Sequence, residues 1–206
     1  MALVNKTDAA SIDMRGPIGD FEGGIAAQDF HDALQEHNGE DVTLMLDSPG
    51  GVVSDGLSIY NALMQYSGKV TVHIDTMAAS IASVIACAAD HVVINSNAQF
   101  MIHKAWTVAM GNSTDFRGLV EQLDQLDGMI ADVYVERTGA SKDELLNMME
   151  EETYLSASDA VAIGFADEIN EIKKDRKPVE NKAFAMAPCV IANRAKAKSL
   201  KMRLTL

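Results

Sequence analysis

One serine lies where a nucleophile could be activated. Ser80 follows an alternating apolar run, residues 70–74, which predicts a half-buried strand, and it opens an alanine-rich helix predicted over residues 80–89. The first turn of a helix has free backbone N–H groups and the positive end of the helix dipole, which favour developing negative charge. Ser80 could therefore attack a carbonyl with part of its oxyanion hole already built. The same position also suits a serine that only caps the helix.

A histidine and a run of glutamates could complete such a site. His103 comes directly after the strand predicted at residues 98–102, and α/β folds place their sites at strand ends. An acyl-transfer serine enzyme needs a base, a group that orients it, and oxyanion donors. His103 and one glutamate of residues 150–152 could supply the first two. Lys104 is another conceivable base, but side chains alternate along a strand, so Lys104 should point away from the side of His103.

A glycine pair follows another apolar run, which comes earlier in the sequence. Gly50 and Gly51 lie between a buried strand predicted at residues 42–46 and an amphipathic helix predicted at residues 53–66. Glycine permits conformations that a side chain would forbid, so a bare N–H could point at a ligand carbonyl, although a plain strand-to-helix connection also fits. No Gly-Lys-Ser/Thr follows, which excludes a phosphate loop. The elbow of the α/β-hydrolases is absent, because alanines flank Ser80 in place of glycines.

The elements that must position these residues alternate between strand and helix. This order predicts an α/β fold with right-handed crossovers and a mostly parallel sheet. A further extended segment with the only tryptophan, Trp106, is expected at residues 105–112. The other predicted elements are a strand at 11–18, a helix at 25–37, a strand at 91–94, helices at 116–137, 142–149 and 157–163, and a strand at 165–172.

Composition predicts one globular domain with an appendage. The chain has 206 residues, of which 48% are hydrophobic, and its two cysteines have neither disulfide-framework nor metal-site spacing, so no metal or cofactor is expected. We expect a short, loose N-terminal extension at residues 1–10, a domain at 11–172 and a basic tail at 173–206. No signal peptide or membrane span is evident, which predicts a soluble cytoplasmic protein with no membrane partner.

The charge is divided unevenly along the chain. Residues 1–172 carry 7 Lys and Arg against 28 Asp and Glu, whereas residues 173–206 carry 10 against 2. An acidic body argues against nucleic acid as the main partner. The basic tail could bind nucleic acid, lie against the acidic body, or extend into solvent.

Four sequence blocks together resemble the proteolytic subunit of the Clp protease (ClpP). Their order matches, and so does their spacing: 29 residues from Gly51 to Ser80, 23 more to His103, and 49 more to Glu152. The resemblance covers about residues 11–172. The particular residues are most similar to those of the ClpP-like head maturation proteases of phages and prophages. The blocks are Ser48-Pro49-Gly50-Gly51-Val52, Met77-Ala78-Ala79-Ser80, Met101-Ile102-His103 and Glu152-Thr153-Tyr154-Leu155-Ser156-Ala157.

The resemblance implies a fold and a set of site residues. The fold is α/β and crotonase-like, with repeated ββα and βα units and the helix at 116–137 projecting as a handle. Ser80 is then the nucleophile and His103 the base, and Glu152 takes the third place, where the family usually has aspartate. Glu150 or Glu151 could take that place if the alignment of this sequence with the family is shifted. The implied oxyanion donors are Gly51 and Ile81, and the implied substrate-binding residues are Gly50, Trp106, Thr107 and Val108.

The function implied is a self-compartmentalising, ATP-independent serine endopeptidase. It would form a heptameric ring, alone or as two stacked rings, and cut extended polypeptide such as phage capsid or scaffold protein, with an association with the prohead. The helix at 116–137 carries a long apolar stripe, including Leu126 and Ile130, which we expect to pair with a facing ring. Only about ten residues precede the first predicted strand, so we leave open whether the protein works with an unfoldase ATPase. The alternatives are a crotonase-type acyl-CoA enzyme and a non-catalytic ring subunit.

Overall fold

The computed structural model describes residues 3–7 and 10–172, in which strands and helices alternate as the sequence predicted. The strands are β1 (Leu3–Thr7), β2 (Ser11–Arg15), β3 (Val42–Ser48), β4 (Val70–Ala79), β5 (His91–Asn95), β6 (Gln99–Ile102), β7 (Thr153–Ser156) and β8 (Glu168–Asn170). The helices are α1 (Ala27–Gln35), α2 (Val53–Met64), α3 (Ile81–Cys87), α4 (Ser113–Thr138), α5 (Lys142–Glu150) and α6 (Ala157–Ile163).

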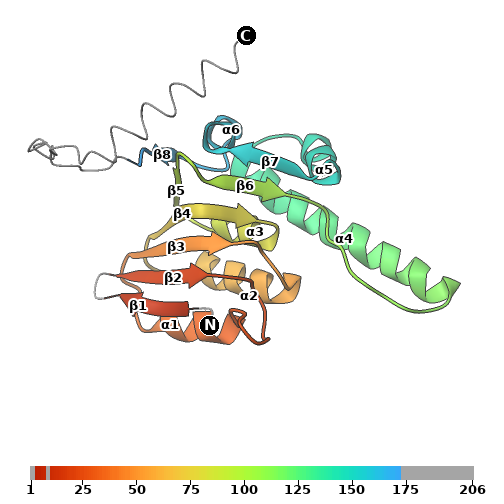
Figure 1. Cartoon of the computed structure of the whole chain (residues 1–206), viewed down its shortest axis with the longest axis horizontal. Coiled ribbons are helices and arrows are strands. Elements are labelled where there is room, and N and C mark those ends of the chain that lie inside the picture. The colour runs from red at the N-terminus through yellow and green to blue at the C-terminus, as the bar shows by residue number, and fades with distance from the viewer. Residues whose placement is uncertain (1–2, 8–9, 173–206) are drawn as a thin grey trace, which may run out of the picture. The chain divides into compact units, whose positions relative to one another are not determined.

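The described strands form one mostly parallel sheet in which β4 is central. Its order is β1-β2-β3-β4-β5-β8, and only β1 runs antiparallel to its neighbour in that row. The first half of β4 pairs with β5, and its last residues, Met77 to Ala79, pair with β6 instead. β7 then pairs with β6 in antiparallel register. One long strand therefore joins the main sheet to a β6–β7 extension (Figure 1).

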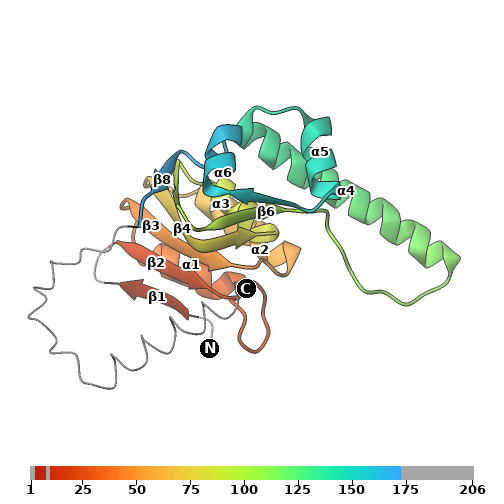
Figure 2. The same cartoon turned by 45° about the horizontal axis from the view of Figure 1, so that its top comes forward.

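The core lies between the sheet and helices α1, α2 and α3, which cover one face of β2, β3 and β4 (Figures 1 and 2). Buried side chains alternate along β3 and β4, as expected of strands with one face in a core. Every residue of α3 is buried, which explains its small side chains. A Cβ at Gly56 of α2 would lie 2.2 Å from Cγ1 of Ile81, so this helix pair requires glycine there.

Polar caps and glycines define the helix ends after residue 110. Asn112 begins α4, because its side chain accepts hydrogen bonds from the N–H groups of Thr114 and Asp115, so the helix begins three residues before the predicted start. Ser141 and Ser156 cap α5 and α6, as predicted. Gly139 and Gly164 end α4 and α6 in the left-handed conformation, with φ of 74° and 101°.

The structure corrects several sequence predictions. The loose segment expected at residues 1–10 contains β1, and β7 was not predicted at all. β4 continues five residues beyond the predicted strand 70–74, whereas the segment at 105–112 forms no strand. The basic tail at 173–206 lies outside the described residues. No helix in the described part of the chain is long and apolar enough to cross a membrane.

The two halves of α4 lie in different surroundings. Its C-terminal half packs into the core through Ile130, Ala131 and Tyr134. Its N-terminal half extends away from the rest of the described chain (Figures 1 and 2), and none of its residues is buried. Ile130 is only 5% exposed, so the expectation that it lies on a surface for a facing ring is wrong.

Candidate active site

Ser80 occupies a strained turn between β4 and α3. Its backbone has φ 56° and ψ −130°, a conformation that non-glycine residues rarely adopt and that costs about 1–3 kcal/mol. Such a turn presents the side chain of a nucleophilic serine at the end of the sheet. The side chain of Ser80 makes no capping hydrogen bond to α3, so the interpretation of Ser80 as a simple helix cap is wrong.

Two buried hydroxyls hold this turn from behind. The backbone N–H and the Oγ of Ser83 both donate to the carbonyl oxygen of Ser80, over 3.0 and 2.5 Å. The hydroxyl of Tyr134 lies 2.8 Å from Ser83 Oγ. Since the Ser83 proton is directed to Ser80, Tyr134 donates in this pair. Ser83 is fully buried and is therefore a support for the turn and not a second nucleophile.

Tyr134→Phe should lower the free energy of unfolding by about 1 kcal/mol, because it removes one buried hydrogen bond and leaves the shape of the core unchanged. Chemical denaturation measures this change. Tyr60→Phe is the matched control, since the hydroxyl of Tyr60 makes no hydrogen bond within the described residues. Equal stability changes in the two variants would contradict a supporting role for Tyr134.

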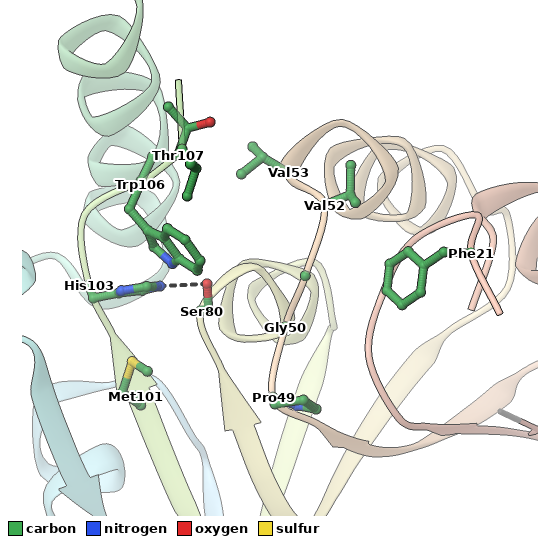
Figure 3. A pocket seen from close by; sticks show the side chains of 13 residues that line it. Phe21, Pro49, Gly50, Val52, Val53, Ser80, Met101, His103, Trp106 and Thr107 are labelled. Atoms are coloured by element: carbon green, nitrogen blue, oxygen red, sulfur yellow. Dashed lines mark hydrogen bonds between the residues drawn. The ribbon is translucent and has the colours of Figure 1, made fainter. Parts of the chain in front are cut away.

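His103 lies beside Ser80 because β6 pairs with the end of β4. The register places Met101 opposite Ala79, and the N–H of Ser80 donates to the carbonyl of Met101 over 3.0 Å. The chain leaves β6 at His103, and its Nε2 lies 2.7 Å from Ser80 Oγ (Figure 3). With Nε2 unprotonated, Ser80 donates to it, which is the arrangement that a general base requires.

The Gly50-Gly51 turn packs directly against the Ser80 turn. Gly50 has φ 91° and Gly51 φ 153°, and a Cβ at Gly50 would lie 2.6 Å from Cβ of Ser80. At Gly51 a Cβ would lie 2.0 Å from the carbonyl oxygen of Ile18. Both positions therefore require glycine for conformation and for close approach. Ile18 also holds the turn in place by bonding to Gly50 and Val52 on either side of Gly51.

Two backbone N–H groups near Ser80 remain available for an oxyanion. The N–H of Gly51 donates no hydrogen bond within residues 3–7 and 10–172. The N–H of Ile81 is the first of α3, where a helix has no internal partner to offer. Within the described residues, the two donors that the resemblance implied are thus both unoccupied and adjacent to the Ser80 turn.

Ser80, His103 and the Gly50-Gly51 turn line one cleft of about 560 Å³. Figure 3 shows His103 and Trp106 on one wall and Val52 and Phe21 on the other, with Ser80 between them. Phe21 is a site residue that sequence reasoning missed, although its place among glycines at 19, 23 and 24 marked an exposed turn. The lining residues are Phe21, Pro49, Gly50, Gly51, Val52, Val53, Ser80, Met101, His103, Ala105, Trp106, Thr107 and Val108.

Glu152 lies near the expected place but bonds elsewhere. β6 and β7 pair Ile102 with Thr153, so continuing the antiparallel register puts Glu152 opposite His103. In this structure the carboxylate of Glu152 accepts a hydrogen bond from the Tyr154 hydroxyl over 2.9 Å. Within the described chain, His103 is hydrogen-bonded to Ser80 and not to Glu152. The third catalytic role therefore stays a prediction.

Neighbouring charges are paired with each other. Lys104 forms a salt bridge with Glu150, which raises the pKa of the lysine. Lys104 is thus directed to α5 and not to Ser80, as strand alternation predicted, and Glu150 is engaged by it. Over residues 3–7 and 10–172, no group of three or more His, Cys, Asp and Glu side chains could hold a metal ion.

A family model described as Clp protease matches residues 9–173, four fifths of the chain. The chain belongs to the Clp protease family. Its ClpP-type α/β fold, predicted from the four sequence blocks, is thereby confirmed. As a member of the Clp protease family, the chain is a serine peptidase of ClpP type.

Proposed function

We propose that this Clp-family chain is an ATP-independent endopeptidase that cuts peptide bonds through an acyl-enzyme on Ser80. The observation that carries the proposal is the 2.7 Å contact between Ser80 Oγ and His103 Nε2 at a strained strand-to-helix turn. His103 takes the serine proton as Oγ attacks the peptide carbonyl. It then gives that proton to the leaving amine, and a water molecule hydrolyses the acyl-enzyme by the same route.

The oxyanion hole in this proposal consists of the N–H groups of Gly51 and Ile81. They border the nucleophile from two different elements, the glycine turn and the first turn of α3. Removing one such donor typically costs about 2.7–4 kcal/mol in the transition state. Both donors are backbone groups, so in this site the geometry of the backbone carries the stabilisation.

The substrate proposed is an extended polypeptide in the 560 Å³ cleft. Its main chain would lie between the glycine turn at residues 50–52 and the segment at residues 106–108, with affinity from backbone hydrogen bonds. Met101, Val52 and Phe21 give the cleft an apolar lining. We therefore expect a preference for an apolar side chain next to the cleaved bond.

A fluorophosphonate experiment tests this function. The reagent should modify the intact protein, and peptide mapping should find the label on Ser80 with no label on the buried Ser83. The protein should also cleave an unfolded protein such as casein without ATP. Turnover of a CoA thioester without peptidase activity would instead favour a crotonase-type acyl-CoA enzyme. Absence of both label and cleavage would favour a non-catalytic ring subunit.

We also propose that the chain assembles into heptameric rings, and that two rings meet through α4. Membership of the Clp protease family supports the ring. The support for the contact between rings is the exposed half of α4, where Phe116 and Val120 are 46% and 56% exposed and Leu119, Leu123 and Leu126 are partly exposed. These side chains recur at helical spacing and form one apolar stripe. Such a stripe on a projecting helix marks an interaction surface.

Val120→Glu should split the particle and lower peptide cleavage, because it places a charge in the proposed contact between rings. Sedimentation velocity measures the particle size, and cleavage of a quenched-fluorescence peptide measures the activity. Gln122→Glu adds the same charge at an exposed position of α4 outside the stripe and should leave both unchanged. An assembly of wild-type size and activity with Val120→Glu would contradict the proposal. Ile130→Glu is unsuitable, since Ile130 belongs to the core.

The biological substrate we propose is a phage capsid or scaffold protein, cut during head maturation in the bacterial cytoplasm or in the prohead. The support is the resemblance of short sequence motifs, such as Gly164-Phe165-Ala166-Asp167-Glu168, to those of phage and prophage ClpP-like proteases. An unfoldase ATPase is not required for a substrate that presents an extended segment. Cleavage of purified scaffold protein without ATP would support this assignment, and a strict ATP requirement would contradict it.

A further inference from the structure

The cleft wall that follows His103 has few backbone anchors. Residues 103–112 form no regular secondary structure, yet Trp106, Thr107 and Val108 line the cleft. The N–H of Lys104 donates to the carbonyl of Met149 over 3.2 Å, and the N–H of Ala105 donates to the side chain of Asp127 over 2.8 Å. Within the described chain, the backbone N–H groups of residues 106–111 donate no hydrogen bond, and the next one that does is that of Asn112.

Asp127 is an unusual residue for its place in α4. It is the first buried residue of the helix and is only 5% exposed. Burial raises the pKa of its carboxyl, and the negative charges of Asp124 and Glu150 act in the same direction. The N–H of Ala105 and the charge of Lys104 act against this rise. Burying a carboxylate costs free energy unless hydrogen bonds or opposite charges compensate, and an apolar residue would pack in such a site at lower cost. The hydrogen bond to Ala105 is therefore the feature of Asp127 to explain.

We propose that Asp127 is a positioning residue that fixes the Trp106–Val108 wall against α4 and thereby sets where peptide binds relative to Ser80 and His103. The inference rests on the proposed peptidase function. Its basis is a single contact between two elements that are far apart in sequence: the Asp127 carboxylate of α4 and the N–H of Ala105 next to the wall. His103 is fixed independently, through β6 and its bond to Ser80.

This arrangement separates binding from chemistry. Loss of the Asp127 contact should release Trp106 and the residues after it, while the Ser80–His103 hydrogen bond stays intact. Peptide binding needs the wall, whereas a small fluorophosphonate needs only the nucleophile and the oxyanion donors. Asp127→Ala should therefore raise KM for an extended peptide about tenfold, the usual worth of a hydrogen bond to a charged group, with a smaller change in kcat.

Asp127→Asn is the conservative variant, because its side-chain oxygen can still accept from Ala105. It should keep KM close to the wild-type value. Asp124→Ala is the matched control on the exposed surface of the same helix and should also behave like wild type. A residue that only stabilised the fold would lower the active fraction, and hence the apparent kcat, without raising KM.

Trp106 gives a second measurement that does not depend on activity. It is the only tryptophan of the chain, so intrinsic fluorescence reports on this wall alone. Trp106 is 73% exposed, so solvent already reaches it in the wild type and its mobility is the quantity to measure. The steady-state fluorescence anisotropy of the folded protein should fall with Asp127→Ala and stay at the wild-type level with Asp127→Asn. Should the wild-type protein show no peptidase activity, the proposed function fails, and the anisotropy of Trp106 still tests whether Asp127 positions the wall.

Ala105→Pro removes the same hydrogen bond from the donor side and leaves α4 unchanged. It should reproduce the rise in KM and the fall in anisotropy, and it serves as the test if Asp127→Ala does not fold. Wild-type KM and wild-type anisotropy in Ala105→Pro or in folded Asp127→Ala would overturn the inference. Equal impairment of Asp127→Ala and Asp127→Asn would also overturn it, because the acceptor would then not be what matters.

Discussion

Ser80→Ala should lower the rate of peptide cleavage by about four to six orders of magnitude, close to the uncatalysed rate with residual help from the oxyanion donors. The variant loses the hydroxyl that forms the acyl-enzyme in the proposed mechanism. It removes only a hydroxyl from a turn that the backbone of Met101 and the Ser83–Tyr134 pair still hold. We therefore expect the fold and the assembly to be retained.

The measurement combines kcat for a quenched-fluorescence peptide with fluorophosphonate labelling and particle size. Ser83→Ala is the matched control, since it removes the neighbouring hydroxyl of the same segment. It should still be labelled on Ser80, although with lower stability, because the carbonyl of Ser80 loses one of its two donors. Wild-type labelling of the Ser80→Ala protein would refute the assignment of the nucleophile.

Glu152→Gln is expected to have the second-largest effect, a fall in kcat of about two to four orders of magnitude with little change in KM. Continuing the antiparallel register of β6 and β7 puts Glu152 opposite His103. The Glu152 carboxylate could reach His103 if its side chain rotated away from Tyr154. A carboxylate there would stabilise the imidazolium that forms in the transition state. Glutamine keeps the size but removes the charge, so it reports on that stabilisation.

Two further variants make this test specific. Glu151→Gln changes the adjacent glutamate and should be close to neutral; a larger effect than that of Glu152→Gln would mean that the third residue is displaced by one. Tyr154→Phe removes the hydrogen bond that holds the Glu152 carboxylate in this structure. It should leave kcat unchanged or raise it. A strong loss of activity in Tyr154→Phe would show that the carboxylate acts through the tyrosine and not on His103.

Local signals in the sequence determined most of the framework. The alternation at residues 70–74, the glycines after β3, and the caps Ser141 and Ser156 each act within a few residues of one another. For that reason they could be read without knowing the fold. Ser80 and His103 could be named because each ends an apolar run, and parallel strands bring such ends to one edge of a sheet.

The tertiary structure alone decided which distant groups meet. β1 and β7 are strands because β2 and β6 offer them partners, and β4 extends to Ala79 because β6 pairs with its end. Their own sequences carry too weak a pattern to show this, since strand formation depends on its partner.

The supporting contacts were hidden for the same reason. Tyr134 reaches Ser83 across 51 residues, and Asp127 reaches Ala105 across 22. In the sequence, Asp127 is one more acid on a helix and Ile130 one more member of an apolar stripe. The packing of α4 decides that both are buried while Val120 is exposed. A hydrogen bond between remote groups depends on distances and burial, which only the folded chain fixes.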